Sequence, residues 1–151
     1  MHYLHTMVRI HDIDTALNFY CTIMGLIEVR RYESETGRFT NIFLAAPRDA
    51  ETAKTHNAPL LELTYNWPNT DGTTETYTGG RNFGHLAYVV DNIYEYCARI
   101  EAAGVTINRP PRDGRMAFFR SPEGISIEIL QAGEALPPQE PWQSRENVGT
   151  W

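Results

Sequence analysis

One pattern of secondary structure occurs twice in this sequence of 151 residues, and this internal repeat is the feature that most constrains the fold. The first copy opens with an alternating strand pattern that contains His5 and continues into a helical segment that ends at Gly25. His85 and Gly104 mark the same two points in the second copy, 80 and 79 residues further along the chain. Because landmarks in one order rarely match by chance, the sequence predicts a duplicated βαβββ module.

Hydrophobic periodicity predicts the elements of each copy. In the first copy we expect a helix over residues 13–24, capped by Asp12, and strands over residues 4–10, 26–30, 39–44 and 60–65. In the second copy we expect a helix over residues 93–103, capped by Asp91, and strands over residues 84–90, 105–107, 116–120 and 125–130. The linker of residues 45–59 is rich in small and polar residues and has neither pattern. The predicted class is α+β, with two repeated βαβββ modules, about residues 1–67 and 80–131, forming a curved mixed sheet.

Composition excludes several classes of protein. With 42% hydrophobic and 21% charged residues, the chain has globular proportions. Thirteen basic and 19 acidic residues give a formal charge of −6, which argues against a nucleic acid or an anionic membrane as a partner. No apolar stretch approaches the roughly 18 residues that a membrane span needs, and no signal-peptide pattern is present at residue 1. We therefore expect a cytoplasmic protein.

The basic residues are unusual because Lys54 is the only lysine and the other 12 are arginines. Arginine presents a rigid fork of donors that suits carboxylates, so an acidic chain of this kind is compatible with a small dicarboxylate ligand. A codon preference for arginine explains the same bias without any site.

The segment of residues 132–151 contains Pro137, Pro138, Pro141, Trp142 and Trp151, which is typical neither of a helix nor of a strand. Proline favours an extended arm, and two tryptophans are poorly placed in water. We expect this C-terminal arm to pack on the domain or on a partner subunit, across a dimer or near a site entrance. A loose tail is the alternative.

Each copy has one histidine on its first strand and one glutamate on its last: His5 with Glu62, and His85 with Glu128. Both glutamates stand among aliphatic residues, where an ionised carboxylate is costly without a metal, a cation or hydrogen bonds. A solvent-facing strand position explains one such glutamate, but four donors at equivalent places are harder to explain in that way. If the modules face each other, the four side chains converge on one divalent cation, and two imidazoles with two carboxylates suit Zn, Ni, Co, Fe or Mn.

Such an ion leaves coordination positions for the two oxygens of an α-hydroxycarbonyl compound. It would stabilise an enediolate, while a nearby carboxylate moves the proton. The residue types are therefore compatible with metal-assisted proton transfer next to a carbonyl group.

Five short segments carry a resemblance to a known family: HTMVRI at residues 5–10, LELTYNW at 61–67, FGH at 83–85, SPEG at 121–124 and IEI at 127–129. They resemble glyoxalase I, also called lactoylglutathione lyase, of the vicinal-oxygen-chelate (VOC) superfamily. The resemblance covers roughly residues 3–131, and ELTYNW, at residues 62–67, is its most specific part. It implies the VOC fold, in which the two modules surround a metal site.

The resemblance implies a set of metal ligands, namely His5, Glu62, His85 and Glu128. It places Glu128 at the principal catalytic base and Glu62 at the carboxylate facing the opposite side of the substrate. A histidine at the position of His5 resembles the nickel- or cobalt-activated enzymes, whereas the segment before His85 resembles the longer, often zinc-dependent form. We expect nickel or cobalt, with zinc as the alternative.

The resemblance also implies the substrate, which is the hemithioacetal of methylglyoxal and glutathione, and the product, S-D-lactoylglutathione. Arg9, Asn66 and Arg81 match glutathione-binding positions, and Arg115 stands near another. In the family the site forms between the subunits of a homodimer, so Arg9 and Asn66 would come from one subunit and Arg81 and Arg115 from the other.

Other functions on the same fold remain open at this point. An acyl-CoA epimerase could use the same ligands, whereas a dioxygenase needs only two histidines and one carboxylate, so a fourth ligand counts against it. A non-catalytic small-molecule-binding protein is the remaining alternative, and retention of four ligands argues against it.

Overall fold

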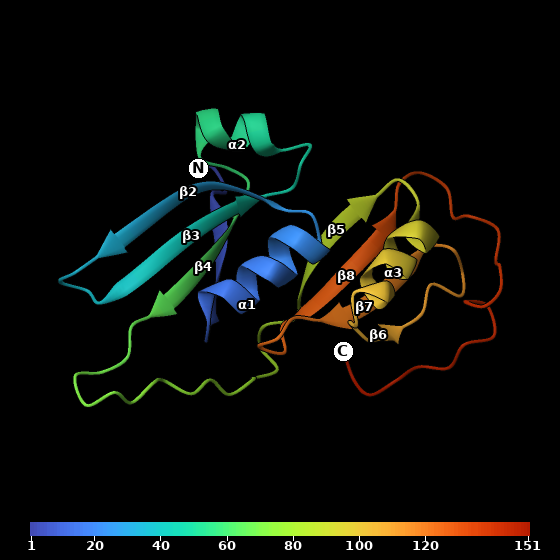
Figure 1. The fold of residues 1–151 in the computed structure, drawn as a ribbon. Helices are drawn as coiled ribbons and strands as arrows, with labels where there is room; N and C mark the ends of the chain where they lie inside the picture. Colours follow the sequence, from blue (N-terminus) through green and yellow to red (C-terminus); the bar gives the residue numbers. More distant parts are fainter. The chain divides into compact units, whose positions relative to one another are not determined.

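A computed structural model describes all 151 residues, which form two compact units, Met1–Thr78 and Gly79–Trp151 (Figure 1). The first unit contains β1 (His5–Ile10), α1 (Ile13–Leu17), the π-helical turn η1 (Asn18–Ile23), β2 (Ile27–Ser34), β3 (Phe39–Ala45), α2 (Ala50–His56) and β4 (Leu60–Asn66). The second unit contains β5 (His85–Val90), α3 (Ile93–Ala102), β6 (Ile107–Arg109), β7 (Met116–Arg120) and β8 (Ser126–Gln131).

Each unit has one four-stranded mixed sheet, and the two sheets have the same topology. The strand orders are β1-β4-β3-β2 and β5-β8-β7-β6. In both sheets the first and last strands of the unit pair in parallel, and the other pairs are antiparallel. The predicted α+β class with two repeated βαβββ modules is therefore confirmed.

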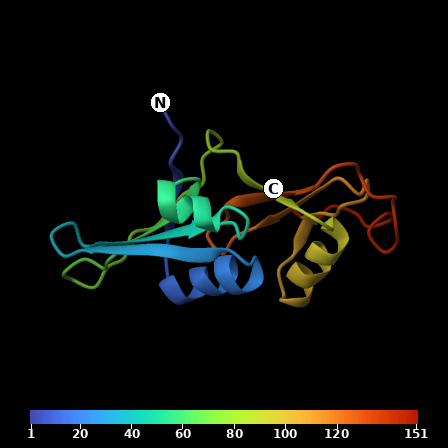
Figure 2. The ribbon, with the colours of Figure 1, turned by 90° about the horizontal axis from the view of Figure 1, so that it is seen from above.

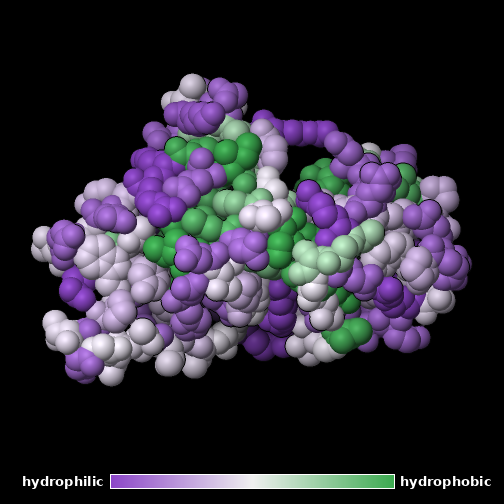
Figure 3. All heavy atoms as spheres, in the orientation of Figure 1, coloured by the Kyte–Doolittle hydropathy of each residue, from purple (hydrophilic) through white to green (hydrophobic).

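Strand alternation divides the first sheet into a buried face and a more open face. In β1, Val8 and Ile10 are buried, whereas His5 and Arg9 on the opposite face are exposed. Figure 2 shows α1 and α2 on opposite sides of this sheet. On the side of α2, its Ala50 and Ala53 join a small apolar cluster with strand residues, namely Phe43, Ala45 and Leu60. Apolar atoms gather beneath α2 in Figure 3. The open face beyond this cluster carries His5 and Arg9.

Helix α2 falls within residues 45–59, where the sequence predicted neither helix nor strand. Asp49 precedes the helix but makes no side-chain capping bond, and the seven residues include only two buried ones. Its stability comes from packing of those two alanines against the sheet rather than from a local signal. The linker prediction was wrong here because a tertiary contact forms the helix.

The predicted helix of residues 13–24 begins as expected, because the Asp12 carboxylate accepts a hydrogen bond from the Thr15 backbone N–H at 2.7 Å. It is α-helical only to Leu17 and continues as the π-helical turn η1. The predicted cap of α3 was displaced by one residue. Asn92, not Asp91, accepts hydrogen bonds from the N–H groups of Tyr94 and Glu95.

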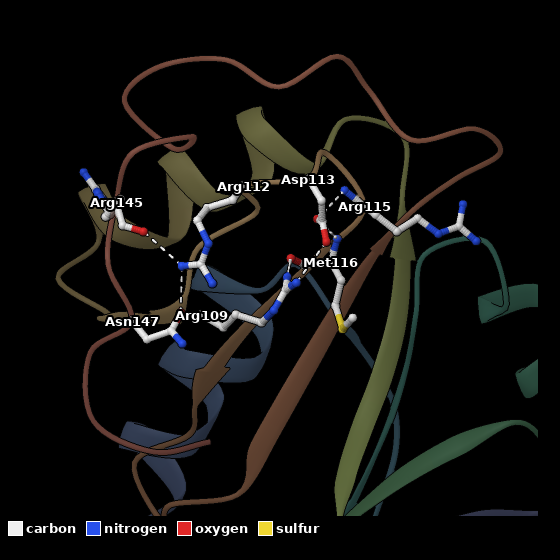
Figure 4. Close-up of polar contacts among 7 residues, drawn as sticks. All are labelled: Arg109, Arg112, Asp113, Arg115, Met116, Arg145 and Asn147. Carbon is white, nitrogen blue, oxygen red and sulfur yellow. Dashed lines mark hydrogen bonds and ion pairs between the residues drawn. The ribbon is translucent and has the colours of Figure 1, made fainter.

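The C-terminal arm, residues 132–151, contains neither helix nor strand and lies along the second unit. Trp142 is buried, and Tyr94 of α3 donates a hydrogen bond to the Pro137 carbonyl at 3.1 Å. Arg112 binds the Arg145 carbonyl at 2.9 Å and the Asn147 side-chain oxygen at 2.8 Å (Figure 4). These contacts hold the arm against the second unit, which it directly follows in sequence. None of the helices is long and apolar enough to cross a bilayer.

The arm also approaches the loop between β6 and β7 very closely. At Gly114, whose φ is +64°, an added Cβ would stand 1.9 Å from the Leu136 carbonyl oxygen. Only glycine combines that backbone conformation with so close an approach.

Candidate functional site

The first unit brings together His5, on its first strand, and Glu62, on its last strand, as the sequence predicted. His5 begins β1 and Glu62 lies in the neighbouring strand β4, where it is opposite Met7 in the parallel ladder. The His5 Nε2 and Glu62 Oε2 atoms are 2.8 Å apart. Glu62 is 8% exposed, so its carboxylate is largely removed from water and needs polar partners.

The second unit repeats this pair with His85 and Glu128. His85 begins β5, and Glu128 stands in the parallel strand β8. The distance between His85 Nε2 and Glu128 Oε2 is 3.2 Å. The histidine side chain is 42% exposed and the glutamate side chain 14% exposed, so this pair also lies at the boundary between sheet and solvent.

A phenylalanine accompanies each pair at the matching position of the next strand. Phe43 in β3 is opposite Glu62, and Phe118 in β7 is opposite Glu128. Phe43 meets the His5 ring edge-on, with centroids 5.9 Å apart, and Phe118 meets the His85 ring in the same way at 5.5 Å. Both phenylalanines are buried, and their edge-to-face contacts restrain the imidazoles.

The outer surroundings of the two phenylalanines differ. The Arg30 guanidinium lies over Phe43, 4.0 Å from the ring centroid. On Phe118 the corresponding neighbour is Trp151 of the C-terminal arm, with ring centroids 6.2 Å apart. The arm therefore reaches the side chains that surround the histidine–glutamate pair of the second unit.

Glu62 has a further partner that sequence reasoning missed. The Asn41 side chain in β3 donates a hydrogen bond from Nδ2 to Glu62 Oε1 at 2.5 Å. Thr64 donates from its hydroxyl to Asn41 Oδ1 at 3.0 Å. Strand alternation puts Asn41 on the same face as Phe43, but only the pairing of β3 with β4 brings Asn41 opposite Thr64 and within reach of Glu62.

The donor set fits a divalent metal ion. Within either unit, no three side chains of His, Cys, Asp or Glu lie together. Each unit has one histidine–glutamate pair, and would therefore supply two ligands. Metal–nitrogen and metal–oxygen bonds of about 2.0–2.2 Å place neighbouring ligand atoms about 3 Å apart. The separations of 2.8 Å and 3.2 Å agree with that spacing. Two imidazoles and two carboxylates are ligands that nickel, cobalt and zinc accept.

Arg9 and Asn66, the two predicted substrate-binding residues of the first unit, lie beyond the histidine–glutamate pair. Arg9 is opposite Thr64 in the ladder, and Asn66 ends β4. Asn66 donates a hydrogen bond to Glu75 Oε2 at 2.5 Å. It also lines a pocket of about 430 Å³, whose other walls are Gly37, Arg38, Trp67, Asn69, Thr73 and Glu75. A polar pocket with charges of both signs therefore surrounds one predicted ligand-binding amide.

The loop after β4 adds Tyr77, which no sequence pattern indicated. Its ring stacks on His11 with a centroid distance of 4.5 Å. Burial raises the pKa of the Tyr77 phenol, and the nearby Glu75 carboxylate raises it further, while the Arg9 charge opposes both effects. The phenol is therefore a neutral hydrogen-bonding group near Arg9 and Asn66.

Arg81 and Arg115, the predicted substrate-binding residues of the second unit, occupy different surroundings. Arg81 is exposed in the segment before β5. Arg115 donates a hydrogen bond to the Gly133 carbonyl at 2.6 Å. In Figure 4 its side chain points away from the cluster formed by Arg109 and Asp113.

The two cysteines are free, and Cys97 is buried. Burial raises the pKa of the Cys97 thiol to about 12, and it also raises the pKa of Cys21. A thiol with a raised pKa holds little of the reactive thiolate near neutral pH.

Comparison with known proteins agrees with this geometry. Residues 2–129 match the model of the Glyoxalase/Bleomycin resistance protein/Dioxygenase superfamily, and the chain belongs to this superfamily. The matched region contains both histidine–glutamate pairs and ends before the C-terminal arm.

Curated relatives narrow the assignment to the lactoylglutathione lyase family of enzymes. A lactoylglutathione lyase of Neisseria meningitidis is 35% identical over 136 residues, which cover 87% of this chain and 91% of that protein. The lactoylglutathione lyase of Salmonella typhimurium is 33% identical over 89% of this chain and 96% of that protein. Among solved structures, glyoxalase I of Leishmania major superposes with a TM-score of 0.73 at 30% identity, covering 87% of this chain and 86% of that one.

Proposed function

We propose that this protein is a metal-dependent glyoxalase I. It would isomerise the hemithioacetal that methylglyoxal forms with glutathione to S-D-lactoylglutathione. The observation that carries the proposal is the repeated histidine–glutamate pair, His5–Glu62 and His85–Glu128, at matched positions in a chain of the lactoylglutathione lyase family.

These four residues would hold one divalent ion, for which we propose nickel or cobalt, with zinc as the alternative. When bound, such an ion supplies positive charge that acidifies the carbon-bound proton of the substrate and stabilises developing negative charge on its oxygens. The four side chains come from matched places in the two modules, so a complete ligand set needs both modules.

Glu128 is the group that we propose moves the proton. Its carboxylate would take the proton from the hydroxyl-bearing carbon of the hemithioacetal, and the neighbouring carbonyl carbon would receive a proton in return. The hydroxyl group would lose its proton and become the thioester carbonyl, and the former carbonyl oxygen would gain a proton and become the hydroxyl of the product. The substrate is thereby isomerised to a thioester without any external oxidant or reductant. Glu62, on the matched position of the other module, faces the opposite side of the substrate in this proposal.

Arg9, Asn66, Arg81 and Arg115 are proposed to bind the glutathione part. Arginine forks suit the carboxylates of the tripeptide, and the Asn66 amide already binds a carboxylate, that of Glu75. About 13 Å separates side chains four residues apart on a strand, which is the spacing of Arg9 from His5 and matches the extent of a tripeptide. We also propose a cytoplasmic homodimer whose subunits share each site, with Arg9 and Asn66 from one subunit and Arg81 and Arg115 from the other.

The test uses the full chain, stripped of metal and reloaded separately with Ni²⁺, Co²⁺ or Zn²⁺. Addition of the methylglyoxal–glutathione hemithioacetal should produce growth of thioester absorbance, and NMR of the product should show S-D-lactoylglutathione. The metal-free protein is the control and should be inactive. Absence of thioester with all three metals would refute the proposed reaction, and turnover of an acyl-CoA epimerase substrate instead would redirect it.

A further inference from the structure

The two carboxylates proposed as metal ligands are held differently, although they occupy matched positions. Glu62 has a partner at each oxygen: Oε2 faces His5 at 2.8 Å, and Oε1 accepts the Asn41 amide at 2.5 Å. Glu128 Oε2 faces His85 at 3.2 Å, and no side-chain amide or hydroxyl donates to either of its oxygens. Glu62 is thus restrained at both carboxylate oxygens, and Glu128 is restrained at one.

The orientation of the Asn41 amide is itself determined by the structure. Thr64 donates its hydroxyl proton to Asn41 Oδ1, so the amide NH₂ group must face Glu62. This order of donors is the one that the hydrogen-bonding capacities allow, because an ionised carboxylate only accepts. Thr64, Asn41 and Glu62 form a short chain of hydrogen bonds across β4 and β3, and both Thr64 and Glu62 are buried.

The second unit lacks this chain because the matching positions are apolar. Asn41 is opposite Thr64 in the first sheet, two residues from the Phe43 and Glu62 pair. The same step from the Phe118 and Glu128 pair leads to Met116 and Leu130, which are opposite each other in the second sheet. Neither side chain carries a hydrogen-bond donor that could restrain Glu128.

We propose that Asn41 is a positioning residue that holds Glu62 as the fixed carboxylate ligand and leaves Glu128 as the carboxylate that can leave the metal and move the proton. The inference rests on the proposed function for the reaction, but the restraint itself lies in the Thr64–Asn41–Glu62 contacts. A charge-assisted hydrogen bond to a largely buried carboxylate is among the stronger polar contacts in a protein. A side chain that hydrogen-bonds to a metal ligand in this way fixes the orientation of that ligand. The duplicated scaffold provides two equal carboxylates, and the residue at one neighbouring strand position makes them unequal.

The test replaces Asn41 by the residue that the second unit has at the same place. Asn41→Met removes the amide, Thr64→Val removes only the hydroxyl that orients it, and Met116→Leu is the matched control in the second unit. Each full-length variant is checked for folding by circular dichroism. Its Co²⁺ affinity is measured by chelator competition, and the visible spectrum of bound Co²⁺ reports the ligand geometry.

Loss of a hydrogen-bond partner of a metal ligand typically weakens metal binding about 10–100-fold, and we expect this for Asn41→Met. The Co²⁺ spectrum of that variant should change as well. Thr64→Val should change affinity and spectrum in the same direction by a smaller factor, and Met116→Leu should leave both unchanged. Thr64→Val keeps the side-chain shape, so it tests the proposal even if Asn41→Met does not fold.

Unchanged affinity and spectrum in Asn41→Met, or in Thr64→Val where that is the folded variant, would overturn the positioning role, whether or not the wild-type protein is an isomerase. Equal effects of Asn41→Met and Met116→Leu would overturn it too. Conversely, a shift confined to the Asn41 and Thr64 variants, in a protein that does not turn over the hemithioacetal, would support the positioning role while refuting the proposed function.

Discussion

The two units share a sheet topology and a histidine–glutamate–phenylalanine arrangement, but they surround it with different residues. In the first unit, Asn41 and Thr64 extend a polar network from Glu62. In the second unit, Met116 and Leu130 occupy the matching positions, and the C-terminal arm places Trp151 against Phe118. The strand positions next to the glutamate are therefore polar in the first unit and apolar in the second. Only the second unit has the C-terminal arm beside its phenylalanine.

This difference shows which features a duplicated module retains and which it changes. The strand order and the ladder positions of the metal-ligand candidates are common to both copies. The neighbours on the adjacent strands differ between the copies: Asn41 and Thr64 stand in the first, and Met116 and Leu130 stand in the second. A symmetric scaffold can in this way provide two ligands of one chemical type with different roles.

The largest expected effect separates the two glutamates. Glu128→Gln removes the proposed base and should lower kcat by about 100-fold or more, in the range of general-base contributions. Glu62→Gln keeps an oxygen for Asn41 and should lower kcat by a smaller factor. Steady-state kinetics with the hemithioacetal on metal-loaded variants measure both effects. Equal losses, or near-full activity of Glu128→Gln, would contradict the division of roles.

The second prediction concerns the arm that distinguishes the second unit. Trp142 is 4% exposed, so Trp142→Ala should lower the free energy of unfolding by about 3–5 kcal/mol, the usual cost of truncating a buried tryptophan. Trp151 is 40% exposed and provides the matched control, for which we expect a much smaller loss. Urea denaturation of both variants measures the difference. A stability of Trp142→Ala close to that of the wild type would show that the arm does not contribute to the core.

The smallest expected effect concerns the β2–β3 hairpin of the first unit and the β6–β7 hairpin of the second, whose contributions to stability should differ in their pH dependence. In the second unit the pKa of Asp113 is lowered: burial opposes the shift, but hydrogen bonds from Arg109 and from backbone N–H groups outweigh it. A lowered folded pKa stabilises the protein above the ordinary value of 3.8, and this contribution disappears as the pH falls through the folded pKa. Because the group is half-exposed, we expect Asp113→Asn to cost less than about 1 kcal/mol at pH 7.

Thermal unfolding of wild type and Asp113→Asn between pH 7 and pH 2 checks this prediction. The difference between them should be constant above about pH 5 and shrink below it. In the first unit, Ser34 closes the β2–β3 hairpin through a neutral hydrogen bond to the Gly37 N–H at 3.0 Å. Ser34→Ala should therefore show a difference that does not depend on pH. A difference for Asp113→Asn that grows toward low pH would contradict the assignment.

Much of the fold was predictable because it follows local periodicity. The strand over residues 116–120 was predicted with its observed bounds, and the strands containing His5 and His85 were displaced by one residue at most. Helix α2 was missed because its alanines are stabilised by Phe43 and Leu60, which lie outside the helix. The shift of the α3 cap to Asn92 depends on which of two adjacent polar residues adopts the extended backbone.

The candidate site residues were predictable, but the residues that hydrogen-bond to them were not. The repeat identified all four proposed metal ligands, and the structure brings each histidine to its glutamate. Asn41 was not identified, since its hydrogen bond to Glu62, 21 positions away in sequence, depends on strand register. Glu75 was not identified because it lies in the loop after β4, which has no periodic pattern. Register is a property of pairing between strands, which a single strand pattern does not contain.

The sequence alone determined the duplication, the alternation of each strand and the chemical type of the proposed ligands, because these follow from spacing and side-chain identity. The tertiary structure decided how each ligand is restrained. Pairing of β3 with β4 places an amide behind Glu62, and pairing of β7 with β8 places a thioether at the corresponding point near Glu128. The physical reason is that a carboxylate's freedom depends on the donors within hydrogen-bond reach, and strand pairing brings those donors from distant parts of the chain.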